Sequence, residues 1–248
     1  MVDIHCHILP GLDDGALSLG EAVRMAAVAA EDGVRTIIAT PHWDPDSRWP
    51  PREVILERTA QVADQLAQAG LPIRLLPGAE LRFCPDLAAR LSARELMTLA
   101  DGGRFVLVEF PSDALPLDAA RLLVELQGAG FVPILAHPER NRPLLADPRR
   151  MARLVDLGVR LQLDASAVLG WDGRRTQRVA RRLIGAGHAH YVATDAHHAE
   201  PGTPRLGECA RTLHRWGGMA AVQQLCVLGP EEIVRTARGG PTPGHGAD

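Results

Sequence analysis

Histidine and carboxylate residues recur in short segments of this 248-residue sequence, each lying at or just after the end of an apolar run. His5 and His7 alternate at the end of the first run, and alternate strand residues point the same way, so both imidazoles can bind one metal ion. Later segments supply seven more donors: Asp14, His42, Glu80, Glu109, His137, Asp195 and His197. A lone histidine at a strand end is more often a hydrogen-bonded structural group, but six strand ends with the same chemistry indicate a shared metal site.

The donors are imidazoles and carboxylates without cysteine, which is typical of Mn, Zn or Fe at hydrolytic sites. They exceed what one ion can bind, so two or three ions that share carboxylates are expected, as in two-metal phosphoester hydrolysis. Arg140 follows His137 by three residues and is expected beside the metals, where its planar guanidinium can hold phosphate oxygens. The alternative for Arg140 is a salt bridge to Glu139 or Asp164.

Seven apolar runs without strict alternation indicate strands buried on both faces. They are Val2–His5, Val34–Thr40, Ile73–Glu80, Arg104–Phe110, Val132–Ala136, Val159–Asp164 and His190–Thr194. Helices are expected over Ala22–Asp32 (with a capping box of Ser18 and Glu21), Arg52–Ala69, Asp86–Leu99, Asp118–Ala129, Pro148–Gly158 and Arg174–Ala186. These repeated strand-then-helix units predict an α/β fold with a parallel sheet, and seven of them favour a barrel, whose active site lies where the strands end. An open doubly wound sheet is less favoured, because no Gly-x-Gly-x-x-Gly follows the first strand.

One domain is expected over residues 1–238. The Gly- and Pro-rich tail, residues 239–248, is expected to be disordered. The segment Trp43–Pro51 holds two tryptophans and three prolines and is expected to form a long, stiff loop.

The sequence contains no lysine, and all 27 basic residues are arginine. This composition excludes Schiff-base, pyridoxal-phosphate and P-loop lysine chemistry. The net charge of −3 disfavours binding along a nucleic-acid backbone, although a local arginine patch could still bind one. No signal peptide or membrane-length apolar run is recognised and the four cysteines are widely spread, so a cytoplasmic location is expected.

Two cysteines match the loose Cys-x5-Arg pattern of thiolate phosphatases: Cys84 with Arg90, and Cys209 with Arg215. A phosphate-binding loop needs backbone curvature that glycine usually permits, and neither segment contains a glycine. Both segments are expected to be helical, so the matches are interpreted as accidental.

Longer motifs carry a family resemblance. Asp-Ile-His5-Cys-His7-Ile-Leu-Pro-Gly-Leu-Asp-Asp14-Gly, Thr-Pro-His42, Gly-Ala-Glu80, Val-Glu109-Phe, His137-Pro-Glu-Arg140-Asn and Thr-Asp195-Ala-His197 resemble the polymerase and histidinol phosphatase (PHP) superfamily. Within it, their order and spacing are similar to those of the manganese-dependent bacterial tyrosine-protein phosphatases of the CpsB/CapC type. The similarity runs from Met1 to about Ala237.

The resemblance implies a single-domain distorted (β/α)7 TIM-like barrel, the PHP fold, with three divalent ions, most often manganese, although Fe or Zn would also suit the donors. It assigns His5, His7, Glu80 and Asp195 to the first ion, Glu80, Glu109 and His137 to the second, and Asp14, His42 and His197 to the third. Arg140 and Arg205 are implied to bind the phosphoryl group, and His42 is counted with them among the catalytic residues. The sequence departs from the family in the Trp43–Pro51 loop and at Asp164, where an uncharged polar residue is expected.

The leading hypothesis is hydrolysis of phosphotyrosine, on a bacterial tyrosine kinase that controls capsular or exopolysaccharide synthesis. A tyrosine leaving group has a pKa near 10 and needs little protonation, so His198 or water at the metals could supply the proton. The alternatives are a phosphatase of small metabolites such as histidinol phosphate, a nuclease, and a non-catalytic module that docks on a kinase.

Overall fold

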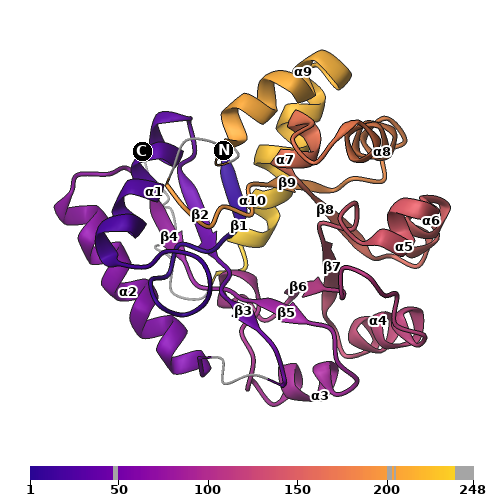
Figure 1. Ribbon diagram of the computed structural model, residues 1–248. Helices are drawn as coiled ribbons and strands as arrows, with labels where there is room; N and C mark the ends of the chain where they lie inside the picture. Colours follow the sequence, from indigo (N-terminus) through magenta and orange to yellow (C-terminus); the bar gives the residue numbers. More distant parts are fainter. Residues whose placement is uncertain (47–49, 200–202, 204, 238–248) are drawn as a thin grey trace, which may run out of the picture.

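The apolar runs form parallel strands, surrounded by helices (Figure 1). The computed structural model describes residues 1–46, 50–199, 203 and 205–237. The strands are β1 (Val2–Cys6), β2 (Thr36–Ala39), β3 (His42–Trp43), β4 (Arg74–Leu76), β5 (Glu80–Arg82), β6 (Phe105–Glu109), β7 (Val132–Ala136), β8 (Arg160–Asp164) and β9 (Tyr191–Ala193). Nine strands are described where seven runs were predicted. The third run contains β4 and the first residue of β5, whereas β3 lies just beyond the second run and takes Trp43 from the predicted loop.

The strands pair as two ladders, β1-β2-β4 and β3-β5-β6-β7-β8-β9. On one side the ladders are joined where β2 continues into β3 and β4 into β5; Pro41 and Pro77, which have no N–H to donate, lie at these breaks. On the other side, the His7 N–H donates to Ala196 O and the Asp195 N–H to His5 O, both at 2.9 Å. The predicted distorted (β/α)7 barrel is therefore confirmed, with its irregularity at the second and third strands.

Gly78 shows why the third run breaks. A Cβ atom built there would lie 2.8 Å from Ile38 Cγ2 and 3.0 Å from Ala39 O. Only glycine lets β4 and β5 approach β2 this closely.

The helices that cover the strands are α1 (Leu19–Glu31), α2 (Arg52–Gln68), α3 (Leu87–Ser92), α4 (Ala119–Gly128), α5 (Arg142–Ala146), α6 (Arg149–Asp156), α7 (Ala165–Leu169), α8 (Arg174–Gly185), α9 (Leu206–Gln223) and α10 (Gly229–Val234), with a 3₁₀ turn at Leu99–Asp101 and a π turn at Gln224–Leu228. The capping interaction is present, because the Glu21 N–H donates to Ser18 Oγ at 3.2 Å. The helix predicted over Asp86–Leu99 is too long: α3 ends at Ser92, and Arg94 adopts a left-handed φ of 60° that a helix cannot continue through. Helices α5, α7 and α10 were not predicted, and of α9 only the segment Cys209–Arg215 was expected to be helical.

Alternation along β6 separates the core into two clusters. Val106 and Val108 pack in the larger cluster, under the helices, whereas Phe105 and Leu107 belong to a smaller inner cluster that includes Ile233 of α10. The same alternation puts Glu109 on the inner side at the end of the strand. The barrel interior is thus apolar toward the amino ends of the strands and polar at their carboxyl ends.

Within the described residues, no helix is both long enough and apolar enough to cross a membrane. The predicted tail, residues 239–248, lies outside the described residues, as do residues 47–49 of the predicted Trp43–Pro51 loop.

Candidate metal centre

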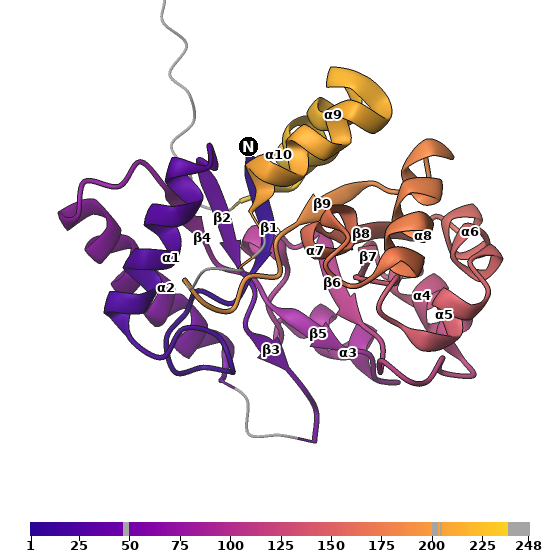
Figure 2. The same cartoon turned by 45° about the horizontal axis from the view of Figure 1, so that its top comes forward.

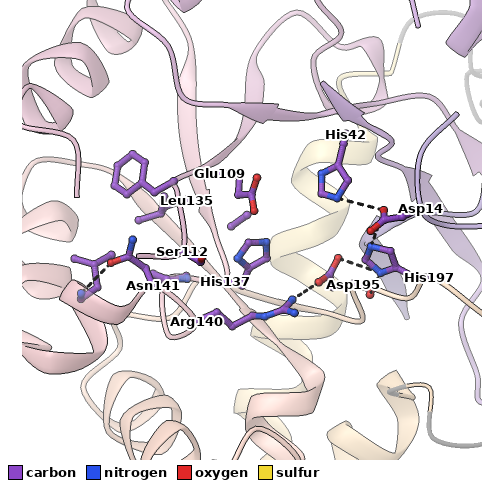
Figure 3. Close-up of a pocket in the computed structure, with 14 residues that line it drawn as sticks. Asp14, His42, Glu109, Ser112, Leu135, His137, Arg140, Asn141, Asp195 and His197 are labelled. Atoms are coloured by element: carbon purple, nitrogen blue, oxygen red, sulfur yellow. Dashed lines mark hydrogen bonds and ion pairs between the residues drawn. The ribbon is translucent and has the colours of Figure 1, made fainter. Parts of the chain in front are cut away.

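All nine predicted ligands lie together, at the carboxyl ends of strands or, for His42 and Glu80, just beyond the carboxyl ends of β2 and β4. Six of them line a cavity of about 210 Å³ (Figure 3), and His5, His7 and Glu80 are buried beneath it. Each comes from a strand end or from the chain that follows it: His5 and His7 from β1, Asp14 from the next loop, His42 from β3, Glu80 from β5, Glu109 from β6, His137 from beyond β7, and Asp195 and His197 from beyond β9. Their donor atoms form four overlapping groups whose atoms lie within 4.8 Å of one another: His7, Asp14, His42 and His197; His5, His7 and Glu80; His5, His137 and Asp195; and His42, Glu80 and Glu109.

The deepest group surrounds His5. Its Nε2 lies 3.2 Å from His7 Nε2, 3.3 Å from Glu80 Oε2 and 3.2 Å from Asp195 Oδ1. All four side chains are almost fully buried. These are the four residues that the family resemblance assigns to the first ion.

Nearer the mouth, Asp14 Oδ1 lies 3.5 Å from His42 Nε2 and 3.4 Å from His197 Nε2. This trio is the implied third ligand set. Glu80 Oε1 lies 2.8 Å from His137 Nε2, and its Oε2 lies 2.8 Å from His42 Nδ1. Glu80 therefore lies between the groups, where a shared carboxylate would have to be.

The residues behind the donors fix which nitrogen of each deep histidine faces the centre. His7 Nδ1 lies 2.7 Å from Asp13 Oδ2, and His5 Nδ1 lies 2.9 Å from Gln162 Oε1. Because both partners are acceptors, each Nδ1 carries a proton, and each Nε2 is the nitrogen that can bind a metal once it has lost its own proton. Neither Asp13 nor Gln162 was assigned this role from the sequence.

Two buried oxygens at the centre, Glu80 Oε2 and Asp195 Oδ1, form no hydrogen bond in the part of the chain that the structure describes. A buried carboxylate oxygen without a partner costs free energy, and a cation removes that cost. Both oxygens face imidazole Nε2 atoms at 3.1–3.6 Å, and Glu80 Oε2 also lies 2.8 Å from His42 Nδ1, so the donor set fits divalent cations.

The carboxylates hold protons on the histidines when no cation is bound. Burial opposes a charge on His7, but Asp13 and Asp195 outweigh burial and raise the pKa of His7 to about 9. Burial also opposes protonation of His137, but Asp164 and Glu80 raise its pKa to about 9. Protons and metal ions therefore compete for the same nitrogens.

Two of the predicted ligands have strained backbones. His137 and Asp195 adopt φ values of 30° and 51°, in the left-handed region that glycine favours. Such strain persists only where the surrounding structure enforces it, and it is common at functional sites.

Arg140 also lines the cavity, and its side chain is 48% exposed. Its Nη1 donates to Asp164 Oδ2 at 3.0 Å and to Asp195 Oδ2 (Figure 3). The salt bridge to Asp164 that the sequence left as an alternative is present. It leaves the guanidinium at the cavity surface, beside the donors.

Asp164 is fully buried behind Arg140. Gln162 Nε2 donates to Asp164 Oδ1 at 3.1 Å, and the Asp164 N–H donates to Glu139 Oε1 at 2.6 Å. Burial, followed by Asp195, raises the pKa of Asp164 to about 6. Gln162 therefore connects Asp164 to His5, and Arg140 connects it to Asp195, so one polar network joins the arginine to the deep donors.

Arg205 lies elsewhere, at the cap position before α9. It is exposed and lines a separate cavity of about 30 Å³ with Asp3, Thr194 and Leu206. His198 lines this second cavity too, with its Nδ1 3.6 Å from Glu21 Oε1. Neither is among the residues that line the metal-site cavity.

The two cysteines of the Cys-x5-Arg matches are buried outside the metal-site cavity. Burial, with Asp86, raises the pKa of Cys84 to about 12, and Arg90 donates to Asp86 at 2.6 Å. Burial in α9 raises the pKa of Cys209 well above its usual value. A protonated thiol is a poor nucleophile, so the structure agrees with an accidental match.

A (β/α) barrel whose strand ends carry imidazole and carboxylate donors around one cavity belongs to the class of metal-dependent barrel hydrolases. More particularly, the chain belongs to the CpsB/CapC family of capsular polysaccharide synthesis proteins, whose family model matches residues 1–235. The resemblance seen in the sequence is thus confirmed.

Individual relatives support this membership. The chain is 37% identical over 200 residues to the tyrosine-protein phosphatase YwqE of Bacillus subtilis, covering 81% of this chain and 78% of that one. A crystal structure from work on YwqE and on CpsB of Streptococcus pneumoniae, described as unique metal-dependent tyrosine phosphatases, matches with a TM-score of 0.90 at 33% identity over 96% of both chains. A lactonase from Listeria monocytogenes, 13% identical over 92% of both chains with a TM-score of 0.65, shares the fold alone.

Proposed function

We propose that this protein is a metal-dependent phosphatase that hydrolyses phosphotyrosine in a protein substrate. The observation that carries the proposal is the convergence of nine metal-type donors in overlapping groups, six of which line one cavity together with Arg140. The named activity of its relatives supports the tyrosine specificity. The substrate that we propose is a bacterial tyrosine kinase of capsular or exopolysaccharide synthesis. Such a kinase uses ATP, so we also propose that the phosphatase acts in the cytoplasm.

Three divalent ions, manganese by preference and Fe or Zn as alternatives, are proposed for the site. The deep set of His5, His7, Glu80 and Asp195 would hold one, Glu80, Glu109 and His137 a second, and Asp14, His42 and His197 a third. When bound, such ions supply positive charge for the phosphate and lower the pKa of coordinated water toward neutrality.

Arg140 would bind the phosphoryl oxygens. Its contacts with Asp164 and Asp195 hold the guanidinium at the cavity wall, so little side-chain entropy is lost when the phosphate arrives. A planar guanidinium can bind two phosphate oxygens at once and stabilises the charge that develops on them. Arg205 would contribute only if the substrate reached the second cavity.

The cavity wall away from the donors suits an aromatic substrate. Phe110, Leu135 and Leu144 line it with apolar surface. Leu135 lies on the opposite side of the cavity from Asp14 and His197 (Figure 3). A phosphotyrosine could place its phosphate among the donors and its ring against this wall, which would exclude water from one side of the reacting phosphate. A phenolate leaves readily because its pKa is near 10, so no strong acid is needed near the ring.

The experiment is hydrolysis of three substrates by one preparation purified without chelator: a phosphotyrosine peptide, histidinol phosphate and single-stranded DNA. We expect manganese-dependent turnover of the peptide at least tenfold above the other two, and loss of turnover with chelator. Metal analysis should find up to three ions per chain. Faster turnover of histidinol phosphate would replace the proposal with a metabolite phosphatase, and no turnover of any substrate would favour a docking module.

A further inference from the structure

Helix α8 carries a concentration of positive charge that the catalytic site does not use. Residues 142–188 contain ten arginines and four acidic residues, whereas the rest of the chain contains 17 arginines and 26 acidic residues. Arg174, Arg175, Arg178, Arg181 and Arg182 all lie on α8 and all are exposed. We call these five residues the arginine surface.

The arginine surface is not neutralised by the fold. Within the described residues, none of its five members forms an ion pair, and Arg181 instead lies over the Trp216 ring at 5.8 Å. Arg174, Arg178 and Arg182 follow one another at intervals of four residues, so they share one stripe along the helix. A stripe of unpaired guanidinium groups attracts an anionic partner.

This surface begins at the rim of the catalytic cavity. Leu144 of α5 lines the cavity, and the carbonyl of the next residue, Leu145, accepts a hydrogen bond from Arg175 Nη2 at 3.3 Å. Asp172, in the turn before α8, is among the acidic groups that act on the charge of Arg140. The first turn of α8 therefore lies beside the cavity, and the rest of the helix leads away from it.

A groove runs beside the stripe, between α6 and α8, which lie side by side in both views (Figures 1 and 2). Its volume is about 320 Å³, and its walls combine Val179 and Leu183 with Arg182 and with Arg149, which is paired with Asp147. Such a lining accepts an extended polypeptide with apolar and acidic side chains.

We infer that the arginine surface is a docking site for an acidic stretch of the phosphoprotein substrate, next to the phosphotyrosine that enters the cavity. The inference rests on the proposed function, because the phosphotyrosine fixes where the docked segment begins. Carboxylates on that segment would pair with α8 guanidinium groups and raise the local concentration of substrate.

Two other polyanions fit the surface less well. An anionic membrane needs apolar side chains to insert, but Val179 and Leu183 are buried and the exposed residues of α8 are mainly arginine. A long nucleic acid would extend past α8 onto a chain that is otherwise acidic.

The test compares two phosphotyrosine peptides of equal length, one with four acidic residues beside the phosphotyrosine and one with the corresponding amides. An aryl phosphate reports the chemistry alone. The variant is R178E with R182E. The matched control is R24E with R74E, which reverses two exposed arginines of α1 and β4 on the other side of the barrel (Figure 1).

We expect the unmodified protein to hydrolyse the acidic peptide with a kcat/KM about tenfold higher than that for the neutral peptide, because its KM is lower. This preference should disappear at high salt. The α8 variant should lose the preference and keep its aryl phosphate turnover, and the control should keep both. Equal kcat/KM for the two peptides, or equal losses in variant and control, would overturn the inference.

Binding of the unphosphorylated acidic peptide, followed by fluorescence anisotropy, separates this inference from the proposed function. If no phosphate ester is hydrolysed but the peptide still binds in a manner that needs Arg178 and Arg182, the docking site stands and the proposed function fails. If vesicles of anionic lipid or single-stranded DNA bind through α8 and the peptide does not, the inference is wrong.

Discussion

The two ends of the barrel interior are built from the same strands, but one is apolar and the other is polar. Toward the amino ends, Phe105 and Leu107 of β6 pack with Ile134 and Ile233 in a fully buried apolar cluster. At the carboxyl end of the same strand, Glu109 joins imidazoles and carboxylates that include hydrogen-bond acceptors without donors. Burial of apolar side chains stabilises the amino end. At the carboxyl end, buried carboxylate oxygens cost free energy, which bound cations would offset. A substitution at one end should therefore affect stability and at the other activity.

The largest effect is expected at the carboxyl end. Asp195→Ala removes a carboxylate that lies within 3.2 Å of both His5 Nε2 and His7 Nε2 and that also contacts Arg140. Turnover of a phosphotyrosine peptide with manganese should fall by about two orders of magnitude or more. Circular dichroism should show the native fold in the variant. Undiminished turnover would separate the donor cluster from catalysis.

The opposite pattern is expected at the amino end. Leu107→Ala empties part of a fully buried site in the inner cluster and should lower the free energy of unfolding by about 2–5 kcal/mol. The folded fraction should keep its turnover, because Leu107 supplies no donor atom itself, although it is the partner of Glu80 in the β5–β6 ladder. Denaturant unfolding combined with kinetics at low temperature checks both parts. A variant of normal stability and low activity would contradict the division between the two ends.

The stability of the metal-free protein and its affinity for manganese should depend on pH in opposite ways. The pKa values of His7 and His137 are raised from about 6.5 to about 9, so without metal they stabilise the fold fully below pH 6.5 and lose that contribution as the pH rises through 9. Metal ions displace these protons, so manganese affinity should rise over the same range. Between pH 6, 7.5 and 9, the melting temperature of the metal-free protein should fall, and the manganese affinity measured by titration should rise. Parallel trends would show that these histidines do not bind the metal.

Most of the contrast between the two ends of the barrel interior could be predicted from the sequence, because it follows from the types of residue at the strand ends. The nine side chains that the structure groups as possible metal donors are the nine predicted from the sequence, since parallel strands bring their carboxyl ends to one rim. The partners Asp13 and Gln162 received no role, because a hydrogen bond to a histidine Nδ1 leaves no mark on spacing. The early end of α3 was missed because the left-handed Arg94 is not a residue type that signals a stop.

A smaller effect is expected at the connection between Arg140 and the deep donors. Asp164→Asn keeps the size and hydrogen-bonding reach of a buried side chain but removes the charge that pairs with Arg140 Nη1. The value of kcat/KM for a phosphotyrosine peptide should fall about three- to tenfold, mainly through KM, because Arg140 is held less firmly. Asp172→Asn, in the exposed turn before α8, is the control and should change it less. An increase in kcat/KM would mean that Asp164 withholds Arg140 from the phosphate.

The smallest effect is expected at the cysteines, which lie in the helical layer rather than at either end of the barrel interior. Cys84→Ser and Cys209→Ser should each leave turnover within about twofold, since burial raises both thiol pKa values far above neutrality and neither side chain lines the metal-site cavity. The same two variants also test whether catalysis belongs to the carboxyl end of the barrel at all, because a thiolate nucleophile would need no metal. If Cys84→Ser abolished turnover and chelation did not, catalysis would take place near α3. The cluster of candidate donors at the carboxyl ends of the strands would then have to serve the stability of the fold rather than catalysis.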